Sequence, residues 1–298
     1  SVQVISSVCA SARPFPGLPS VMAEQSEQCK PCQADEEMPP RASDDAQPGS
    51  CEAGVDPSPP VLSGDAASDL STELGSDESE SEATGGDACS SPVGPFSAEE
   101  TLLIFDWDDT LMPSTYIQQQ GLRLDSGSAP SEEQWAQLQQ AAECARATLL
   151  AAKQRGRVIV VTNGEQGWVE LSCWKFMPWL APTLEGVQVV SARSTYERQG
   201  VTSPFEWKLY AFEHTIHSFY AGKGVKLRRN VISLGDSMHE HMALVNVTQG
   251  MPNCRAKSLK FVSLPRVEQL VEQHNLVSGR LDDIVDHDGD LILEVSAT

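Results

Sequence analysis

Short apolar runs alternate with amphipathic segments from residue 98 onward. Continuous apolar stretches predict buried strands at 101–106, 157–161, 187–191, 230–234 and 259–263. Apolar residues at helical spacing predict helices at 131–154, 166–175, 204–220, 239–247 and 266–274, and leave open an extension of the last one through 280–285. Such alternation is typical of a parallel sheet with helices on both faces. We therefore predict one α/β domain over 98–298, a doubly wound, Rossmann-like sheet of about five strands.

The first third of the chain has a different pattern. Residues 1–97 are rich in Pro, Ser, Gly, Asp and Glu, with two Phe and no Trp or Tyr. A segment with so few large apolar residues cannot offset the conformational entropy lost on folding, so we predict a disordered acidic tail. Serines lie among acids in 71–82, where phosphorylation would add negative charge. Two interpretations stay open: a solvating linker, and a segment that engages a protein partner.

Charge and composition narrow the function classes. The chain has a net charge of −21, of which −14 lies in residues 1–97. Without clustered Lys and Arg we expect no nucleic acid partner. No run approaches the ~20 apolar residues that a membrane span needs, so we expect a soluble protein.

The cysteines bear on compartment. Three of the eight fall in the predicted domain, and an odd number there favours reduced thiols and a cytoplasmic or other intracellular compartment. The chain begins with Ser, which leaves a targeting peptide open. Cys29 and Cys32 have redox or zinc-ligand spacing, but there is no second pair.

Polar side chains follow three of the predicted strands. Asp106, Asp108 and Asp109 come at the end of the first, Thr162 follows the second, and Asp236 follows the fourth. Ligands of parallel sheets lie at the carboxyl ends of the strands. Three neighbouring acids repel one another unless a cation such as Mg²⁺ neutralises them. The alternative is an acidic turn that caps a helix, with Asp109 or Thr110 as the cap.

Residues 101–265 resemble the haloacid dehalogenase-like (HAD) hydrolase superfamily. Its four motifs occur in order, as Asp-Trp-Asp-Asp-Thr over 106–110, Thr162, Lys208, and Gly-Asp-Ser-Met-His-Glu over 235–240. The chain also looks like a subgroup that carries Phe-Asp-Trp-Asp-Asp-Thr-Leu and a second segment, Trp-Val-Glu-Leu-Ser-Cys at 168–173. The resemblance implies a HAD-like fold.

The resemblance implies roles that agree with the chemistry of the residues. Asp106 would be the nucleophile that forms an aspartyl-phosphate. Asp108 would protonate the leaving oxygen and then take a proton from water. Asp106, Asp236 and the backbone carbonyl of Asp108 would bind Mg²⁺. Thr162 and Lys208 would stabilise the charge of the phosphoryl group.

Further residues support these groups. Asn163 and Gly164 would offer backbone N–H groups to phosphate. Thr110 would fix the loop and the orientation of Asp108, and Glu240 would hold a metal-bound water or orient Lys208. Asp109 is left as a loop residue.

The implied function is a Mg²⁺-dependent phosphatase. An acid two residues after the nucleophile favours phosphoryl transfer over dehalogenation. The segments between Thr110 and Val158 and between Thr162 and Lys208 are too short for a large cap domain. A site without a cap can admit a bulky substrate such as a phosphoprotein side chain, or be covered by a partner subunit, and the phosphorylated substrate could be a small molecule or a phosphoprotein. The alternative is a catalytically silent HAD-fold binding or scaffold protein whose acidic tail engages a partner.

Other candidate residues keep two interpretations. His214 and His217 are expected at the surface or in packing, whereas His239 and His241 could approach a substrate. Trp168, Trp174, Phe176 and Trp179 could form a substrate platform or part of the core. The acidic segment 286–290 lacks the full ligand spacing of a calcium loop and is expected to be a turn.

Overall fold

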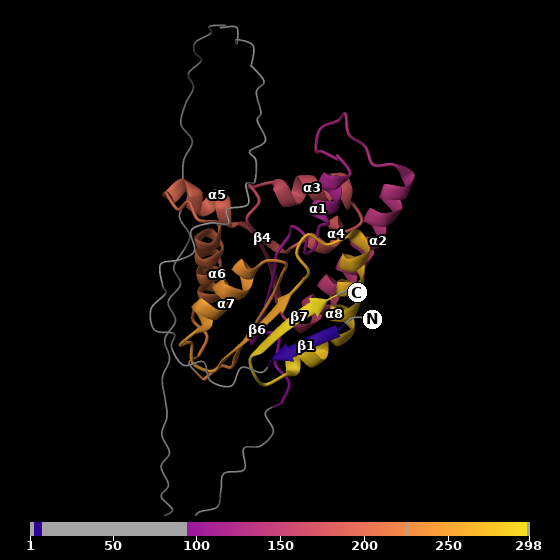
Figure 1. Ribbon diagram of the computed structural model, residues 1–298. Helices are drawn as coiled ribbons and strands as arrows, with labels where there is room; N and C mark the ends of the chain where they lie inside the picture. Colours follow the sequence, from indigo (N-terminus) through magenta and orange to yellow (C-terminus); the bar gives the residue numbers. More distant parts are fainter. Residues whose placement is uncertain (1–2, 8–93, 225, 297–298) are drawn as a thin grey trace, which may run out of the picture. The chain divides into compact units, whose positions relative to one another are not determined.

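The computed structural model describes residues 3–7, 94–224 and 226–296 (Figure 1). The predicted disorder of residues 8–93 lies outside the described residues. Within the described ranges, no helix is long and apolar enough to cross a membrane.

One sheet of seven strands organises the fold, in the order β1-β7-β6-β5-β2-β3-β4. Six strands run parallel, and β1 pairs with β7 in the antiparallel direction. Their bounds are β1 Gln3–Ser7, β2 Thr101–Phe105, β3 Arg157–Thr162, β4 Gln188–Ser191, β5 Arg229–Gly235, β6 Cys254–Lys260 and β7 Leu291–Ser296. The prediction of a parallel α/β sheet is confirmed.

The predicted count of about five strands is too low. β7 was missed: Leu291–Ser296 contains four apolar residues, but it directly follows the acidic segment 286–290, which was expected to be a turn. β1 lies within the tail that was predicted to be disordered; five residues with no flanking pattern become a strand only through pairing with β7. The fifth predicted strand, 259–263, covers only the end of β6, whose first half is polar.

The predicted helices lie close to their predicted places, and the described residues add three short α-helices. Their bounds are α1 Ser114–Gln119, α2 Glu132–Arg155, α3 Trp168–Phe176, α4 Ala181–Leu184, α5 Ala192–Tyr196, α6 Pro204–Tyr220, α7 Met238–Thr248 and α8 Val267–Asp286, with a 3₁₀ turn at Glu197–Gln199. The extension beyond 274 is therefore part of α8. Helices α1, α4 and α5 were missed because they span less than two turns each.

Alternate side chains of β2 enter two separate cores. Leu103 and Phe105 pack in a cluster with apolar residues of α2 and α8. Leu102 and Ile104 pack in a second cluster with residues of α6 and α7. Figure 1 accordingly shows α6 and α7 on one side of the sheet and α2 and α8 on the other. Burial on both faces explains why β2 is apolar throughout.

The strand order reverses between β2 and β5. From β2 the chain proceeds outward to β3 and β4, then returns to β5 on the other side of β2 and continues outward to β6 and β7. The carboxyl ends of β2 and β5 thus flank a topological switch point, where doubly wound sheets bind ligands. Between β2 and β3 the described residues form α1, a loop and the long helix α2, which packs against α8, and between β3 and α6 they form β4 and short helices, so neither described segment builds a large cap domain.

Candidate functional site

Asp106 is the first residue after β2 and is still held by the sheet. Its backbone N–H donates to the carbonyl of Leu234 on β5 at 2.9 Å. Its carboxylate is buried. The nucleophile that the sequence predicted therefore sits on rigid backbone at the switch point.

Glu240 reaches the same place because of the way α7 begins. Ser237 and Glu240 form a capping box, in which Ser237 Oγ accepts from the N–H of His239 at 3.1 Å and Glu240 Oε2 accepts from the N–H of Ser237 at 3.2 Å. This turns the Glu240 side chain back toward the end of β5. Gly235 leaves the room, since a Cβ there would lie 2.4 Å from Glu240 Cγ.

Lys208 connects the two acids. It lies in the second turn of α6, is 1 % exposed, and its Nζ lies 2.8 Å from Asp106 Oδ1 and 2.9 Å from Glu240 Oε1. A third bond runs from Nζ to the carbonyl of Val161 at the end of β3 at 2.8 Å. Lys208 is thus fixed by β2, β3 and α7 at once, and one of the two predicted roles of Glu240, to orient Lys208, matches this geometry.

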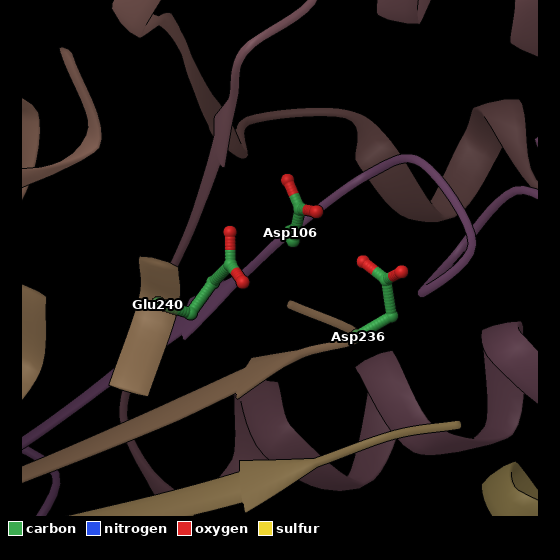
Figure 2. A group of neighbouring side chains, drawn as sticks. All are labelled: Asp106, Asp236 and Glu240. Atoms are coloured by element: carbon green, nitrogen blue, oxygen red, sulfur yellow. The ribbon is translucent and has the colours of Figure 1, made fainter. Parts of the chain in front are cut away.

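The carboxylates of Asp106, Asp236 and Glu240 converge from three elements (Figure 2). Each has an oxygen within 4.8 Å of the others. Asp236 follows β5, and its carbonyl accepts from Lys260 Nζ at 2.9 Å and from Ser263 Oγ at 2.5 Å. With all three ionised and Lys208 protonated, the cluster carries a charge of −2, the charge that a divalent cation would balance.

The pKa shifts in the cluster follow from burial and from these neighbours. Burial, with repulsion from Glu240 and Asp108, raises the pKa of Asp106 well above its usual range against the attraction of Lys208. Burial, with Glu240 and Asp109, raises the pKa of Asp236 to about 7.

The pKa values of Lys208 and Glu240 shift in the direction opposite to the one that burial alone would cause. Burial works to lower the pKa of Lys208, but Asp106 and Glu240 outweigh it and raise that pKa. Burial works to raise the pKa of Glu240, but Lys208 and the bonds from Ser237 lower it. Lys208 and Glu240 therefore form a stable ion pair, and the unbalanced negative charge rests on the two aspartates.

Asp108 lies apart from this cluster and faces different partners. Its carboxylate accepts from Ser114 Oγ at 2.5 Å, from Trp168 Nε1 at 2.9 and 3.2 Å, and from Thr162 Oγ1 at 3.3 Å. The predicted metal contact through its backbone carbonyl stays a prediction. Ser114 was missed, because it lies in the unpredicted helix α1.

The end of β3 places the predicted phosphate donors beside Asp108. Thr162 is buried, and its Oγ1 accepts from the N–H of Gly164 at 2.8 Å. Asn163 Nδ2 donates to the carbonyl of Pro204 at 3.1 Å, which ties the loop to the start of α6. Asn163 and Gly164 both line the pocket described below.

Asp109 and Thr110 have structural partners. Asp109 is buried at φ 51°, and its carboxylate accepts from Thr115 N at 2.8 Å and from Thr115 Oγ1 at 2.5 Å, which caps α1. Thr110 Oγ1 has no hydrogen-bond partner among the described residues, and the Thr110 carbonyl lies 2.8 Å from His274 Nε2. Asp109 thus bonds to the first turn of α1, as the capping alternative expected of it, although Pro113 is the N-cap residue. No hydrogen bond joins Thr110 to Asp108 in the described part of the chain, and the predicted role of Thr110 stays a prediction.

His274 is a residue that sequence reasoning missed. It is fully buried in α8, with Nδ1 3.0 Å from Thr148 Oγ1 on α2 and Nε2 against the loop after β2. Burial lowers its pKa to about 4. His274 is therefore neutral, and its side chain connects α2 to the loop that carries Asp106 and Asp108. The only signal in the sequence was a polar residue on the apolar face of a helix.

A cavity of about 510 Å³ opens above these groups. Its lining includes Asp106, Asp108, Lys208 and Glu240, together with Trp168 and His239. His239 thus approaches the site, as one interpretation expected. His214 and His217 are exposed on α6, away from it.

The predicted aromatic group is divided by the structure. Trp168 lines the cavity, Phe176 is buried in the core, and Trp174 and Trp179 are exposed.

The segment 286–290 forms a turn between α8 and β7, in which Asp288 pairs with Arg255 and Asp290 accepts from Ala256 N. Cys144, Cys173 and Cys254 are free.

Fold and site together define an α/β protein with a parallel sheet and a buried carboxylate–lysine cluster at its switch point. Comparisons of the chain with protein-family models, with curated proteins and with solved structures gave no match.

Proposed function

We propose that this protein is a Mg²⁺-dependent phosphatase of the HAD type, which hydrolyses phosphomonoesters through an aspartyl-phosphate at Asp106. The observation that carries the proposal is Lys208, whose ammonium is held between Asp106 and Glu240 at 2.8 and 2.9 Å. With all three carboxylates ionised and Lys208 protonated, two negative charges in excess would remain in the same cluster. A buried site with this charge balance suits the binding of a metal ion and a phosphoryl group. A buried ion cluster that served only for packing would add little to stability.

The donor set fits Mg²⁺. Asp106, Asp236 and Glu240 offer only carboxylate oxygens, which are the ligands that this hard cation prefers. Glu240 is already paired with Lys208 and Ser237, so Asp106 and Asp236 would be the direct ligands. When bound, the ion would offset the charge of the carboxylates and of the phosphoryl oxygens.

Asp106 has one oxygen free for attack. Oδ1 is paired with Lys208, and among the described residues no donor pairs with Oδ2. Oδ2 would attack phosphorus, so that a bond from Oδ2 to phosphorus forms while the bond from phosphorus to the leaving oxygen breaks. Lys208, Thr162 and the backbone N–H of Asn163 would stabilise the charge on the phosphoryl oxygens, since the N–H of Gly164 is already bonded to Thr162 Oγ1.

Asp108 would move the protons. It lies two residues on, in the same cavity as Asp106. As an acid it would protonate the leaving oxygen, and as a base it would then take a proton from the water that attacks the phosphoenzyme. The products are the alcohol and inorganic phosphate, with Asp106 restored. The open cavity would admit either a small phosphomonoester or a phosphorylated side chain.

Phosphate release from 4-nitrophenyl phosphate, with and without Mg²⁺, tests the proposal. We expect Mg²⁺-dependent turnover that Asp106→Asn reduces by at least ~10³-fold. Asp125→Asn, in an exposed loop, is the matched control and should keep full activity. If the wild type and Asp106→Asn are equal across a broad panel of phosphomonoesters, the phosphatase proposal fails and the scaffold alternative gains.

A further inference from the structure

Two tryptophans connect the loop after β2 to helix α3. Trp107 lies between Asp106 and Asp108 and is fully buried, and its Nε1 donates to Ser172 Oγ at 3.1 Å. Ser172 Oγ donates in turn to the carbonyl of Trp168, one turn earlier in α3, at 2.6 Å. The indole of Trp168 returns to the loop, where Nε1 donates to both oxygens of Asp108.

Together these hydrogen bonds form a closed ring between the loop after β2 and helix α3. It starts on the backbone of the loop at Trp107, passes through Ser172 to the backbone of Trp168, and ends one residue further along the loop at Asp108. Each link is a hydrogen bond: the one from Trp107 to Ser172 is buried, and the others are partly buried. The place of the Trp168 indole is therefore fixed relative to Asp108 by the loop itself.

The loop after β3 makes room for the indole. A Cβ at Gly164 would lie 2.4 Å from Trp168 Cδ1, so only glycine allows the ring to lie against this loop. The carbonyl of Gly164 accepts from Ser191 Oγ at 2.7 Å, which holds the loop in place. The ring is thus seated by α3 below and by the β3 loop beside it, with its one polar atom turned to Asp108.

We propose that Trp168 is a positioning residue for Asp108, and that Trp107 and Ser172 fix the place of its indole. The inference rests on the proposed phosphatase function. A rigid N–H directed at both carboxylate oxygens holds the group in one orientation, toward the leaving oxygen of a substrate in the cavity. Ser114 and Thr162 each donate to one oxygen and complete this support.

Trp168→Phe tests the role because it keeps an aromatic ring and removes the donor. The readout is kcat/KM for two substrates: 4-nitrophenyl phosphate, whose leaving group departs without a proton, and glycerol phosphate, whose alkoxide needs one. We expect kcat/KM to fall about 10-fold or more for glycerol phosphate and by less than about 2-fold for the aryl ester. Trp174→Phe, at a 75 % exposed position of the same helix, should change neither.

The outcomes separate this inference from the function on which it rests. If the wild type turns over neither these two esters nor any other of the broad phosphomonoester panel, the phosphatase proposal has failed. If the wild type is active and Trp168→Phe lowers both substrates equally, or lowers neither, the positioning role is overturned while the function stands. Ser172→Ala keeps the indole and loosens its support, so we expect a smaller loss with the same preference for the alkyl ester.

A second measurement needs no catalysis and covers the case in which Trp168→Phe does not fold. The indole N–H resonance of Trp168 in a ¹⁵N spectrum of the full chain should move upfield in Asp108→Ala, because its acceptor is lost. The indole resonance of Trp107, bonded to Ser172, should move less. A Trp168 resonance unchanged by Asp108→Ala would overturn the contact and the proposal with it.

Discussion

Two lysines of this chain are buried to the same extent and behave in opposite ways. Lys208 is 1 % exposed and Lys257 is 0 % exposed. Lys208 has two carboxylates within 3 Å, and its pKa is raised. Lys257, on β6, donates to the carbonyl of Val285 at 2.8 Å and lies 4.8 Å from the ring of Phe96; burial lowers its pKa to about 7.

The difference shows what distinguishes a functional cluster from a packed polar residue. Desolvation opposes the charge of both lysines. At the switch point the chain brings two carboxylates into direct contact with Lys208 and these outweigh the cost, whereas the more distant acids near Lys257 do not. Lys257 is satisfied by a neutral acceptor and can lose its proton; Lys208 must keep it. A fixed positive charge is what a phosphoryl site requires.

The largest expected effect compares the two lysines directly. Lys208→Met leaves Asp106 and Glu240 buried without their partner, so we expect phosphatase activity to fall by ~10³-fold and the free energy of unfolding by about 3–5 kcal/mol. Lys257→Met should keep activity within about twofold. Initial rates and urea unfolding at pH 7 measure both. Equal losses of activity in the two variants would remove the basis of the comparison.

His274 extends the comparison to a buried base without any charged partner. Its folded pKa is about 4 against an unfolded value of 6.5, so its contribution to stability is complete above pH 6.5 and is lost as the pH falls toward 4. The loss amounts to about 3 kcal/mol. Urea unfolding of the wild type and of His274→Gln over this range tests it: the variant should lose less stability on acidification, and parallel curves would contradict the assignment.

Lys257 should give a pH dependence on the alkaline side. Its folded pKa is lowered to about 7, so the unfolded state binds the proton more tightly and stability rises as the pH increases above 7. Between pH 7 and pH 9 the gain is about 2 kcal/mol. Over this range the free energy of unfolding of the wild type should therefore rise by that amount relative to that of Lys257→Met. A constant difference would show that Lys257 stays charged.

Asp236 belongs to the cluster around Lys208, in which negative charge is in excess when the carboxylates are ionised. Its pKa of about 7 means that ionisation between pH 4 and pH 7 destabilises the metal-free fold, and that protons compete with Mg²⁺. We expect Mg²⁺ to raise the melting temperature more at pH 8 than at pH 6. Asp236→Asn should remove this response and stabilise the metal-free protein by about 4 kcal/mol at pH 8. A Mg²⁺ response that survives in Asp236→Asn would exclude it as a ligand.

The sequence predicted most of the parallel sheet because buried strands leave an unmistakable apolar pattern. Residues 101–106 and 157–161 match β2 and β3 to within one residue. β6 was misplaced because its first half, which includes Arg255 and Lys257, is polar. A long side chain whose polar end reaches a carbonyl is compatible with a central strand, but hydrophobic pattern alone does not reveal it.

Site residues that belong to a sequence motif were predictable. Contacts between residues far apart in the sequence were not. Asp106, Lys208 and Asp236 were singled out by their motifs and do converge. The contact from Trp168 to Asp108 spans 60 residues, and that from His274 to Thr110 spans 164. Such pairs depend on which helices pack beside the loop, and no local pattern encodes that.

Trapping the phosphoenzyme tests the central claim most directly. The full chain would be quenched in acid during turnover of 4-nitrophenyl phosphate with Mg²⁺, reduced with borohydride, and its peptides sequenced by mass spectrometry. An aspartyl-phosphate is reduced to homoserine, and we predict that change at residue 106 alone. It should be absent without substrate and in Asp106→Asn. Active enzyme with residue 106 unmodified, or with the label on another acid, would contradict the account.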